Sequence, residues 1–100
     1  QAFGEYVVDV LETPGHCPGG VCLAIGRADS TARELFVGDT LFAGSIGRTD
    51  LPGGDAKTLL RSIREVLLAF PDDTPVHSGH GPETTIGAER RTNPFLIQER

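Results

Sequence analysis

The sequence predicts one domain of the mixed α/β (α+β) class, with about four to five strands, one long helix and one short helix. Short runs of β-branched and apolar residues recur along the first half of the chain, and they are typical of strands. One apolar stripe of helical period occupies residues 55–70. Thirteen glycines and seven prolines among 100 residues indicate many tight turns between these elements.

Five segments have the composition of strands. Residues 6–11 and 21–25 are rich in valine and isoleucine, and we expect them to form a hairpin. Residues 34–37 read as a third, buried strand, and residues 41–43 as a short apolar continuation. Residues 75–77 predict a further short strand after the long helix.

The long helix is predicted over residues 55–70. Asp55 supplies an N-cap, and a proline directly after the last apolar residue ends the helix. A short helix is expected over residues 86–91, capped by residues 84–85 and ended at residues 93–94. The long helix is expected to face the core with a stripe of apolar residues at three- and four-residue steps: Leu59, Leu60, Ile63, Val66, Leu67 and Phe70.

Composition and charge narrow the classes of function. The net charge of −5, with acidic and basic residues interspersed, argues against a nucleic-acid-binding protein, which needs a basic face. No apolar run is long enough to cross a membrane, and no secretory leader is recognisable. Cys17 and Cys22 have neither the spacing of a zinc pair nor the number for a disulfide framework. We therefore expect a cytoplasmic protein without nucleic-acid or membrane partners.

Three residues with metal-binding side chains follow glycines in turn-rich segments. Asp39 ends the strand of residues 34–37 after Gly38, His16 lies in Thr-Pro-Gly-His, and His80 lies in Gly-His-Gly-Pro. Each alone has an ordinary structural explanation: a turn carboxylate for Asp39 and a loop histidine for the other two. Their shared pattern of strand, glycine and ligand-type side chain favours a joint metal site formed by loops at the ends of neighbouring strands.

Other polar residues leave alternatives open. His77 lies on a predicted strand and is interpreted as structural, as is Cys17, which has no neighbour that would lower its thiol pKa strongly. Arg48 belongs either to a loop salt bridge or to a binding site for an anionic substrate. The Gly-Gly pair at 53–54 lacks the following Lys-Ser or Lys-Thr of a P-loop, so a phosphate-binding loop is rejected.

Four ordered motifs span nearly the whole chain. They are Thr-Pro-Gly-His-Cys-Pro-Gly-Gly, Gly-Asp-Thr-Leu-Phe, Gly-Arg-Thr-Asp-Leu-Pro-Gly-Gly-Asp, and the segment from Gly-His-Gly-Pro through Asn-Pro-Phe-Leu. Together they resemble the metallo-β-lactamase superfamily, and within it most closely the glyoxalase II-like (hydroxyacylglutathione hydrolase-like) branch. The resemblance implies an αββα sandwich with a metal site at one edge of two sheets.

The resemblance also assigns roles to the three candidate ligands. It implies that His16 serves one metal, that Asp39 bridges two metals, and that His80 serves the second metal. The metals in this family are usually zinc, two Zn²⁺ per complete domain, with iron or manganese also found.

The family's His-x-His-x-Asp-His motif, which supplies four further ligands, is absent from residues 1–100. We expect it upstream of Gln1, so the chain is interpreted as the C-terminal half of a metallo-β-lactamase-like domain whose N-terminal half is its missing partner. A zinc site typically needs three or four protein ligands, so we expect this fragment alone to be inactive.

The function implied for the intact domain is hydrolysis of a small-molecule thioester by a metal-bound hydroxide, with Asp39 as the catalytic bridging ligand. Glutathione thioesters are candidate substrates. Two alternatives remain: a mononuclear iron persulfide dioxygenase of the same fold, and a half-domain without catalysis of its own.

Overall fold

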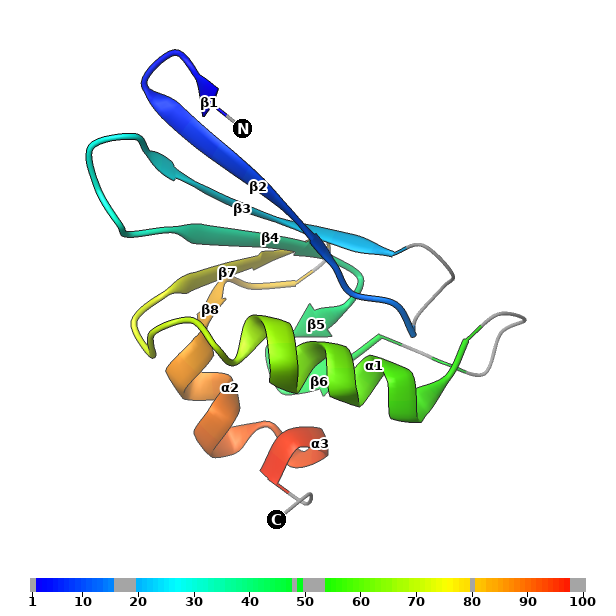
Figure 1. Cartoon of the computed structure of the whole chain (residues 1–100). Helices are drawn as coiled ribbons and strands as arrows, with labels where there is room; N and C mark the ends of the chain where they lie inside the picture. Colours follow the sequence, from blue (N-terminus) through cyan, green and yellow to red (C-terminus); the bar gives the residue numbers. More distant parts are fainter. Residues whose placement is uncertain (1, 16–19, 48, 50–53, 80, 98–100) are drawn as a thin grey trace.

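The computed structural model describes residues 2–15, 20–47, 49, 54–79 and 81–97. Its main element is a six-stranded sheet with the strand order β1-β2-β3-β4-β7-β8. Figure 1 shows this sheet with a separate two-stranded hairpin, β5–β6, beside it. The strands are β1 (Ala2–Phe3), β2 (Tyr6–Glu12), β3 (Val21–Arg27), β4 (Glu34–Gly38), β5 (Leu41–Phe42), β6 (Ser45–Ile46), β7 (Pro75–Ser78) and β8 (Thr84–Thr85).

The strand directions bring three loops to one edge of the sheet. β2 pairs antiparallel with β3, β3 pairs antiparallel with β4, and β4 pairs parallel with β7. The carboxyl ends of β2, β4 and β7 therefore lie at the same edge. The parallel pairing of β4 and β7 requires a long crossover, and the helical segment between them supplies it.

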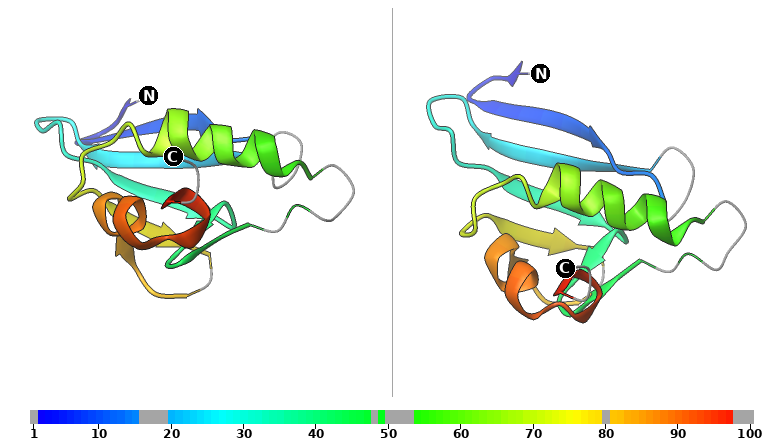
Figure 2. Two further views of the ribbon diagram at one scale, coloured as in Figure 1. Left: turned by 90° about the horizontal axis from the view of Figure 1, so that it is seen from below. Right: turned by 60° about the horizontal axis from the view of Figure 1, so that its bottom comes forward.

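The helices lie together on one face of the sheet (Figures 1 and 2). They are α1 (Ala56–Ser62), which continues as a π-helical turn over Ile63–Leu67, α2 (Ile86–Thr92) and α3 (Pro94–Ile97). Between helices and sheet lies one core of closely packed apolar side chains, each at most 7% exposed: Cys22, Ala24, Leu35, Val37, Leu41, Leu59, Ile63, Leu67, Val76, Ile86 and Leu96.

The opposite face of the sheet has no covering helix in the described part of the chain (Figure 2). Side chains alternate along a strand, so directly paired residues point to the same face. Val10 pairs with Leu23, and Leu23 pairs with Phe36, which places all three on this face. Val10 is 61% exposed and Val21 is 51% exposed. We call this surface, made by Val10, Val21, Leu23 and Phe36, the open face.

The mixed α/β class and all five predicted strand segments are confirmed. The structure adds three strands of two residues each, β1, β6 and β8, which are too short to show any alternation in the sequence. The predicted C-terminal end of the long helix, at residue 70, was wrong. The last helical residue is Leu67, and the chain turns before reaching Phe70. A third helix, α3, begins at Pro94, where the fixed φ of proline suits a first helical position.

In the described segments no helix has both the length and the apolar character needed to cross a membrane.

Candidate metal centre

Asp39 lies at the carboxyl end of β4, where its side chain is exposed. Gly38 has a φ of +53°, a left-handed conformation that favours glycine, and its carbonyl accepts a 2.7 Å hydrogen bond from the amide of Gly79. A Cβ atom added to Gly79 would lie only 3.2 Å from Asp39 Oδ1. The Asp39 carboxylate is thus held beside the backbone of the residue that directly precedes His80.

The loop that leads to His16 is anchored on α1. The Gly15 carbonyl accepts a 2.7 Å hydrogen bond from the Asp55 amide, and the Pro14 carbonyl accepts a 2.8 Å hydrogen bond from Ser62 Oγ. Gly15 has a φ of +129°, and a Cβ atom there would lie 2.2 Å from the backbone nitrogen of Leu59. Only glycine allows the loop to approach the helix this closely.

A buried thiol connects the segments that lead to His16 and follow Asp39. Cys22 Sγ lies 3.1 Å from Thr13 Oγ1, and it also hydrogen-bonds the hydroxyl of Thr40. Burial raises the pKa of the Cys22 thiol from its ordinary value of 9.0, and the two hydroxyl contacts lower the pKa by less. Cys22 therefore remains a neutral thiol at neutral pH and acts as a packing and hydrogen-bonding group between these two segments.

A buried carboxylate fixes the hairpin that follows Asp39. Glu89 is 2% exposed, and its Oε1 accepts a 2.9 Å hydrogen bond from the amide of Gly44, in the turn between β5 and β6. The side chain of Asn93, which is fully buried, reaches the same hairpin.

The predicted site residues divide into one that the structure describes and three that it does not. Asp39 is placed as expected, at the edge to which the loops after β2, β4 and β7 converge. His16, His80 and Arg48 lie outside the described residues, as does Cys17. In the described ranges no three His, Cys, Asp or Glu side chains form a group that could hold a metal ion.

His77 belongs to the sheet rather than to this edge, in keeping with its structural interpretation. Its ring stacks on Phe36 with ring centroids 4.8 Å apart, and its Nε2 lies 2.7 Å from Glu34 Oε1. Phe36 and His77 are register partners across β4 and β7, so both belong to the open face.

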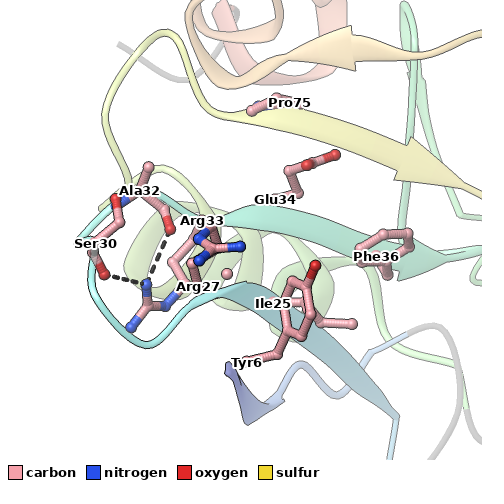
Figure 3. Close-up of a pocket in the computed structure, with 10 residues that line it drawn as sticks. Tyr6, Ile25, Arg27, Ser30, Ala32, Arg33, Glu34, Phe36 and Pro75 are labelled. Atoms are coloured by element: carbon pink, nitrogen blue, oxygen red, sulfur yellow. Dashed lines mark hydrogen bonds between the residues drawn. The ribbon is translucent and has the colours of Figure 1, made fainter. Parts of the chain in front are cut away.

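A cavity of about 370 Å³ lies at the other end of the strands (Figure 3). Its lining includes Tyr6, Glu34 and Pro75, which begin β2, β4 and β7, whereas Asp39 follows the end of β4. Arg33 closes one side, with its Nη1 donating 2.9 Å hydrogen bonds to the carbonyls of Ser30 and Ala32. The cavity is therefore separate from the edge that carries Asp39.

Comparison with known families identifies the fold. Residues 3–80 match the model of the metallo-beta-lactamase superfamily. The chain belongs to this superfamily. The superfamily binds metal ions, and the exposed carboxylate of Asp39 at the sheet edge is a side chain of a type that can bind one.

Two relatives with curated names are similar to most of this chain. A probable metallo-hydrolase, YqgX, of Bacillus subtilis (strain 168) is 50% identical over 94 residues, which are 94% of this chain and 43% of that protein. A hydroxyacylglutathione hydrolase, GloC, of Haemophilus influenzae (strain ATCC 51907 / DSM 11121 / KW20 / Rd) is 50% identical over 88 residues, which are 88% of this chain and 40% of that protein. The chain thus spans about two fifths of the length of these relatives.

Two solved structures share this arrangement of strands and helices. The structure of TTHA1623 in a di-iron-bound form has a TM-score of 0.79 and 47% identity, covering 96% of this chain and 45% of that one. ETHE1 from Myxococcus xanthus has a TM-score of 0.84 and 34% identity, covering all of this chain and 44% of that one.

Sequence reasoning missed the residues that support the loops. Thr13, Cys22 and Thr40 are close only because β2, β3 and β4 are neighbours. The only sequence signal for Glu89 and Asn93 is their four-residue spacing on one helix face, which many surface pairs share.

Proposed function

We propose that this chain forms part of the active site of a metal-dependent hydrolase that acts on small-molecule thioesters, with glutathione thioesters as the substrate class. The observation that carries the proposal is the position of Asp39. Its carboxylate is exposed at the edge where the loops after β2, β4 and β7 leave the sheet, against the backbone of Gly79. The name of the GloC relative, hydroxyacylglutathione hydrolase, supports the choice of substrate.

The donor set fits a zinc centre, with iron or manganese as alternatives. Carboxylate oxygen and imidazole nitrogen are ordinary ligands of Zn²⁺, and in the proposal they come from Asp39, His16 and His80. Glycine at position 79 avoids crowding of Asp39 Oδ1, since an added Cβ atom would lie 3.2 Å from this oxygen. When bound, the metal lowers the pKa of a coordinated water and polarises the carbonyl of the substrate.

The described residues prepare this site before a metal binds. The Gly79 amide holds the Gly38 carbonyl, which fixes the backbone on which Asp39 is carried. Asp55 and Ser62 hold the two carbonyls just before His16. Such supporting contacts orient ligands and account for a large part of metal affinity.

Arg48 is proposed to bind an anionic group of the substrate, since a guanidinium pairs well with a carboxylate. The remaining metal ligands are proposed to come from the part of the relatives that this chain does not span. We also propose that residues 1–100 alone do not turn over substrate.

The test uses the complete protein that contains these residues, assayed for hydrolysis of S-lactoylglutathione and for bound metal. We expect Asp39→Ala to lower kcat/KM at least about a hundredfold and to reduce the metal content. The reason is that losing a metal ligand should reduce affinity and activity more than losing a supporting contact, which typically costs about 10- to 100-fold. Asp29→Ala is the matched control, since Asp29 lies in an exposed turn beside Arg27. Unchanged turnover and metal content in the Asp39 variant would refute the proposal.

The competing activity is persulfide dioxygenation by a mononuclear iron site of the same fold. Two histidines and one carboxylate with open positions are the ligand set of such iron oxygenases. Oxygen consumption with glutathione persulfide, together with no release of thiol from S-lactoylglutathione, would replace the hydrolase proposal by this one.

A further inference from the structure

Glu89, on α2, is almost completely buried, at 2% exposure. Its carboxylate accepts three hydrogen bonds. Oε1 accepts from the Gly44 amide at 2.9 Å and from Asn93 Nδ2 at 2.9 Å, and Oε2 accepts from Thr84 Oγ1 at 2.6 Å. Burying a carboxylate costs free energy unless it is hydrogen-bonded, and these three bonds offset that cost. Removing the carboxylate would leave the three donors without their acceptor, which is itself destabilising.

The hydrogen bond from the Gly44 amide connects Glu89 to the segment that follows Asp39. Gly44 lies in the turn of the β5–β6 hairpin, whose base closes on Thr40, the residue after Asp39. The Gly47 amide donates a 3.0 Å hydrogen bond to the Thr40 carbonyl, and the Thr40 amide donates a 2.9 Å bond to the Val37 carbonyl. The hairpin is therefore a direct continuation of the turn that presents Asp39.

The hydrogen bond from Thr84 Oγ1 connects Glu89 to the segment that follows His80 in the sequence. Thr84 follows His80 by four residues, in β8, which pairs with the strand β7 that precedes His80. Thr84 and Val76 are register partners. One carboxylate thus contacts the segment after Asp39 and the segment after His80.

Asn93 strengthens the attachment to the hairpin. Its Nδ2 lies 2.9 Å from Glu89 Oε1 and 3.0 Å from the Ser45 carbonyl. Its Oδ1 accepts a 2.9 Å bond from the Phe95 amide, which fixes the orientation of the amide group. Glu89 and Asn93 therefore contact the hairpin at neighbouring residues, Gly44 and Ser45, and also bond each other.

We propose that Glu89 is a positioning residue that ties the β5–β6 hairpin, which follows Asp39, to β8, which follows His80 in the sequence, and so helps to pre-form the metal site. The inference rests on the proposed metal site. Glu89 acts through the β5–β6 hairpin and through Thr84. A purely structural Glu89 would stabilise α2 without affecting metal affinity, and the test separates the two roles.

The experiment measures zinc affinity by calorimetry against a competing chelator, and amide hydrogen exchange in the metal-free complete protein. We expect Glu89→Ala to weaken zinc binding about 10- to 100-fold, the usual effect of losing a supporting contact. We also expect faster exchange of the Gly47 and Gly79 amides, which close the turns around Asp39.

Two further variants keep the test informative. Glu89→Gln retains an oxygen acceptor for Gly44 and Asn93, while the Thr84 hydroxyl can rotate to accept from the new amide, so affinity should be largely restored. Thr84→Val keeps the side-chain shape and removes only the link towards His80. It should speed exchange at Gly79 more than at Gly47, and it replaces Glu89→Ala if that variant does not fold.

Arg90→Ala is the matched control on the same helix. Arg90 donates to the Leu68 carbonyl and pairs with Asp72, so its loss should lower stability without changing zinc affinity or exchange in the hairpin. If Glu89→Ala and Thr84→Val behave like this control, the positioning role is overturned. If the unsubstituted protein binds no zinc, the metal-site proposal fails. The exchange measurement then still tests Glu89 separately: faster exchange at Gly47 and Gly79 in Glu89→Ala supports its role in holding these segments, and unchanged exchange overturns it.

Discussion

At the residue scale, the loop before His16 depends on a backbone contact that only one residue type permits. Gly15 combines a φ of +129° with a position against the backbone of Leu59. The contact joins the segment after β2 to the first turns of α1, and it fixes the direction in which the chain leaves the strand.

We predict that Gly15→Ala lowers the free energy of unfolding by about 2–5 kcal/mol, the sum of backbone strain and overpacking. Urea denaturation of the complete protein measures the change. Gly4→Ala is the control, because Gly4 has a φ of +61° with no atom within 4 Å of the added Cβ. The control should lose only about 1–2 kcal/mol from strain. Equal losses in the two variants would contradict the close approach at Leu59.

The residue scale also shows what the sequence alone reveals about the site. The position of Asp39 at the end of a strand was predictable, because an acidic residue directly after a buried apolar run can be recognised from the sequence alone. Cys22 and Glu89 were not, because their partners come from other elements: Thr13 and Thr40 for the thiol, and Gly44 for the carboxylate. A hydrogen-bond network assembled by tertiary contacts leaves no local pattern.

At the scale of elements, α1 is positioned by its N-cap. Asp55 Oδ1 accepts hydrogen bonds from the amides of Lys57 at 3.0 Å and Thr58 at 3.2 Å, while its own amide donates to Gly15. The cap thus serves both the helix and the loop before His16. The bond from the Thr58 amide is the main reason that the pKa of Asp55 lies below its ordinary value of 3.8.

We predict that Asp55→Ala lowers the denaturation midpoint at neutral pH and reduces the dependence of stability on acid. Because the native pKa is depressed, the stabilisation from Asp55 is present above pH 3.8 and is lost as the pH falls through the lower native pKa. Denaturation midpoints between pH 7 and pH 2 measure the effect. Asp55→Asn keeps an acceptor oxygen and should retain most of the midpoint at neutral pH. A variant with the acid dependence of the unsubstituted protein would contradict this role.

The same helix shows where periodicity stops being informative. Leu59, Ile63 and Leu67 follow at four-residue intervals and are fully buried, as predicted. The π-helical turn is invisible in that pattern, since it is defined by the 2.8 Å bond from the Leu68 amide to the Ile63 carbonyl. Gly87, which reduces helix propensity, lies within α2 because a Cβ there would lie 2.7 Å from the Cβ of Asp72. Packing between elements decides both cases.

At the scale of the whole molecule, the open face is the feature that distinguishes this chain from a closed domain. Val10, Val21 and Phe36 are 61%, 51% and 40% exposed on one face of the sheet, while the other face is covered by three helices. Contiguous apolar surface of this kind is typical of a surface that another structure covers. We propose that the part of the relatives beyond this chain covers the open face.

That proposal predicts opposite effects of one double substitution in two contexts. Residues 1–100 produced alone should self-associate through the open face, and Val10→Lys with Val21→Lys should shift them towards monomer, because two charges oppose burial of this surface. Sedimentation velocity over a range of concentrations measures the shift. Phe95→Lys is the control, since Phe95 is 45% exposed on α3 and lies off the open face.

In the complete protein the same double substitution should destabilise, by about 1–3 kcal/mol for each valine, because the lysines would replace apolar side chains that are buried there. Urea denaturation measures this second effect, and Phe95→Lys again serves as the comparison. Destabilisation of the complete protein together with a more monomeric fragment requires that the open face is covered in one context and exposed in the other. A complete protein indifferent to the two lysines would contradict the proposal that this face is covered. A fragment that is monomeric at every concentration without substitution would contradict self-association through the open face.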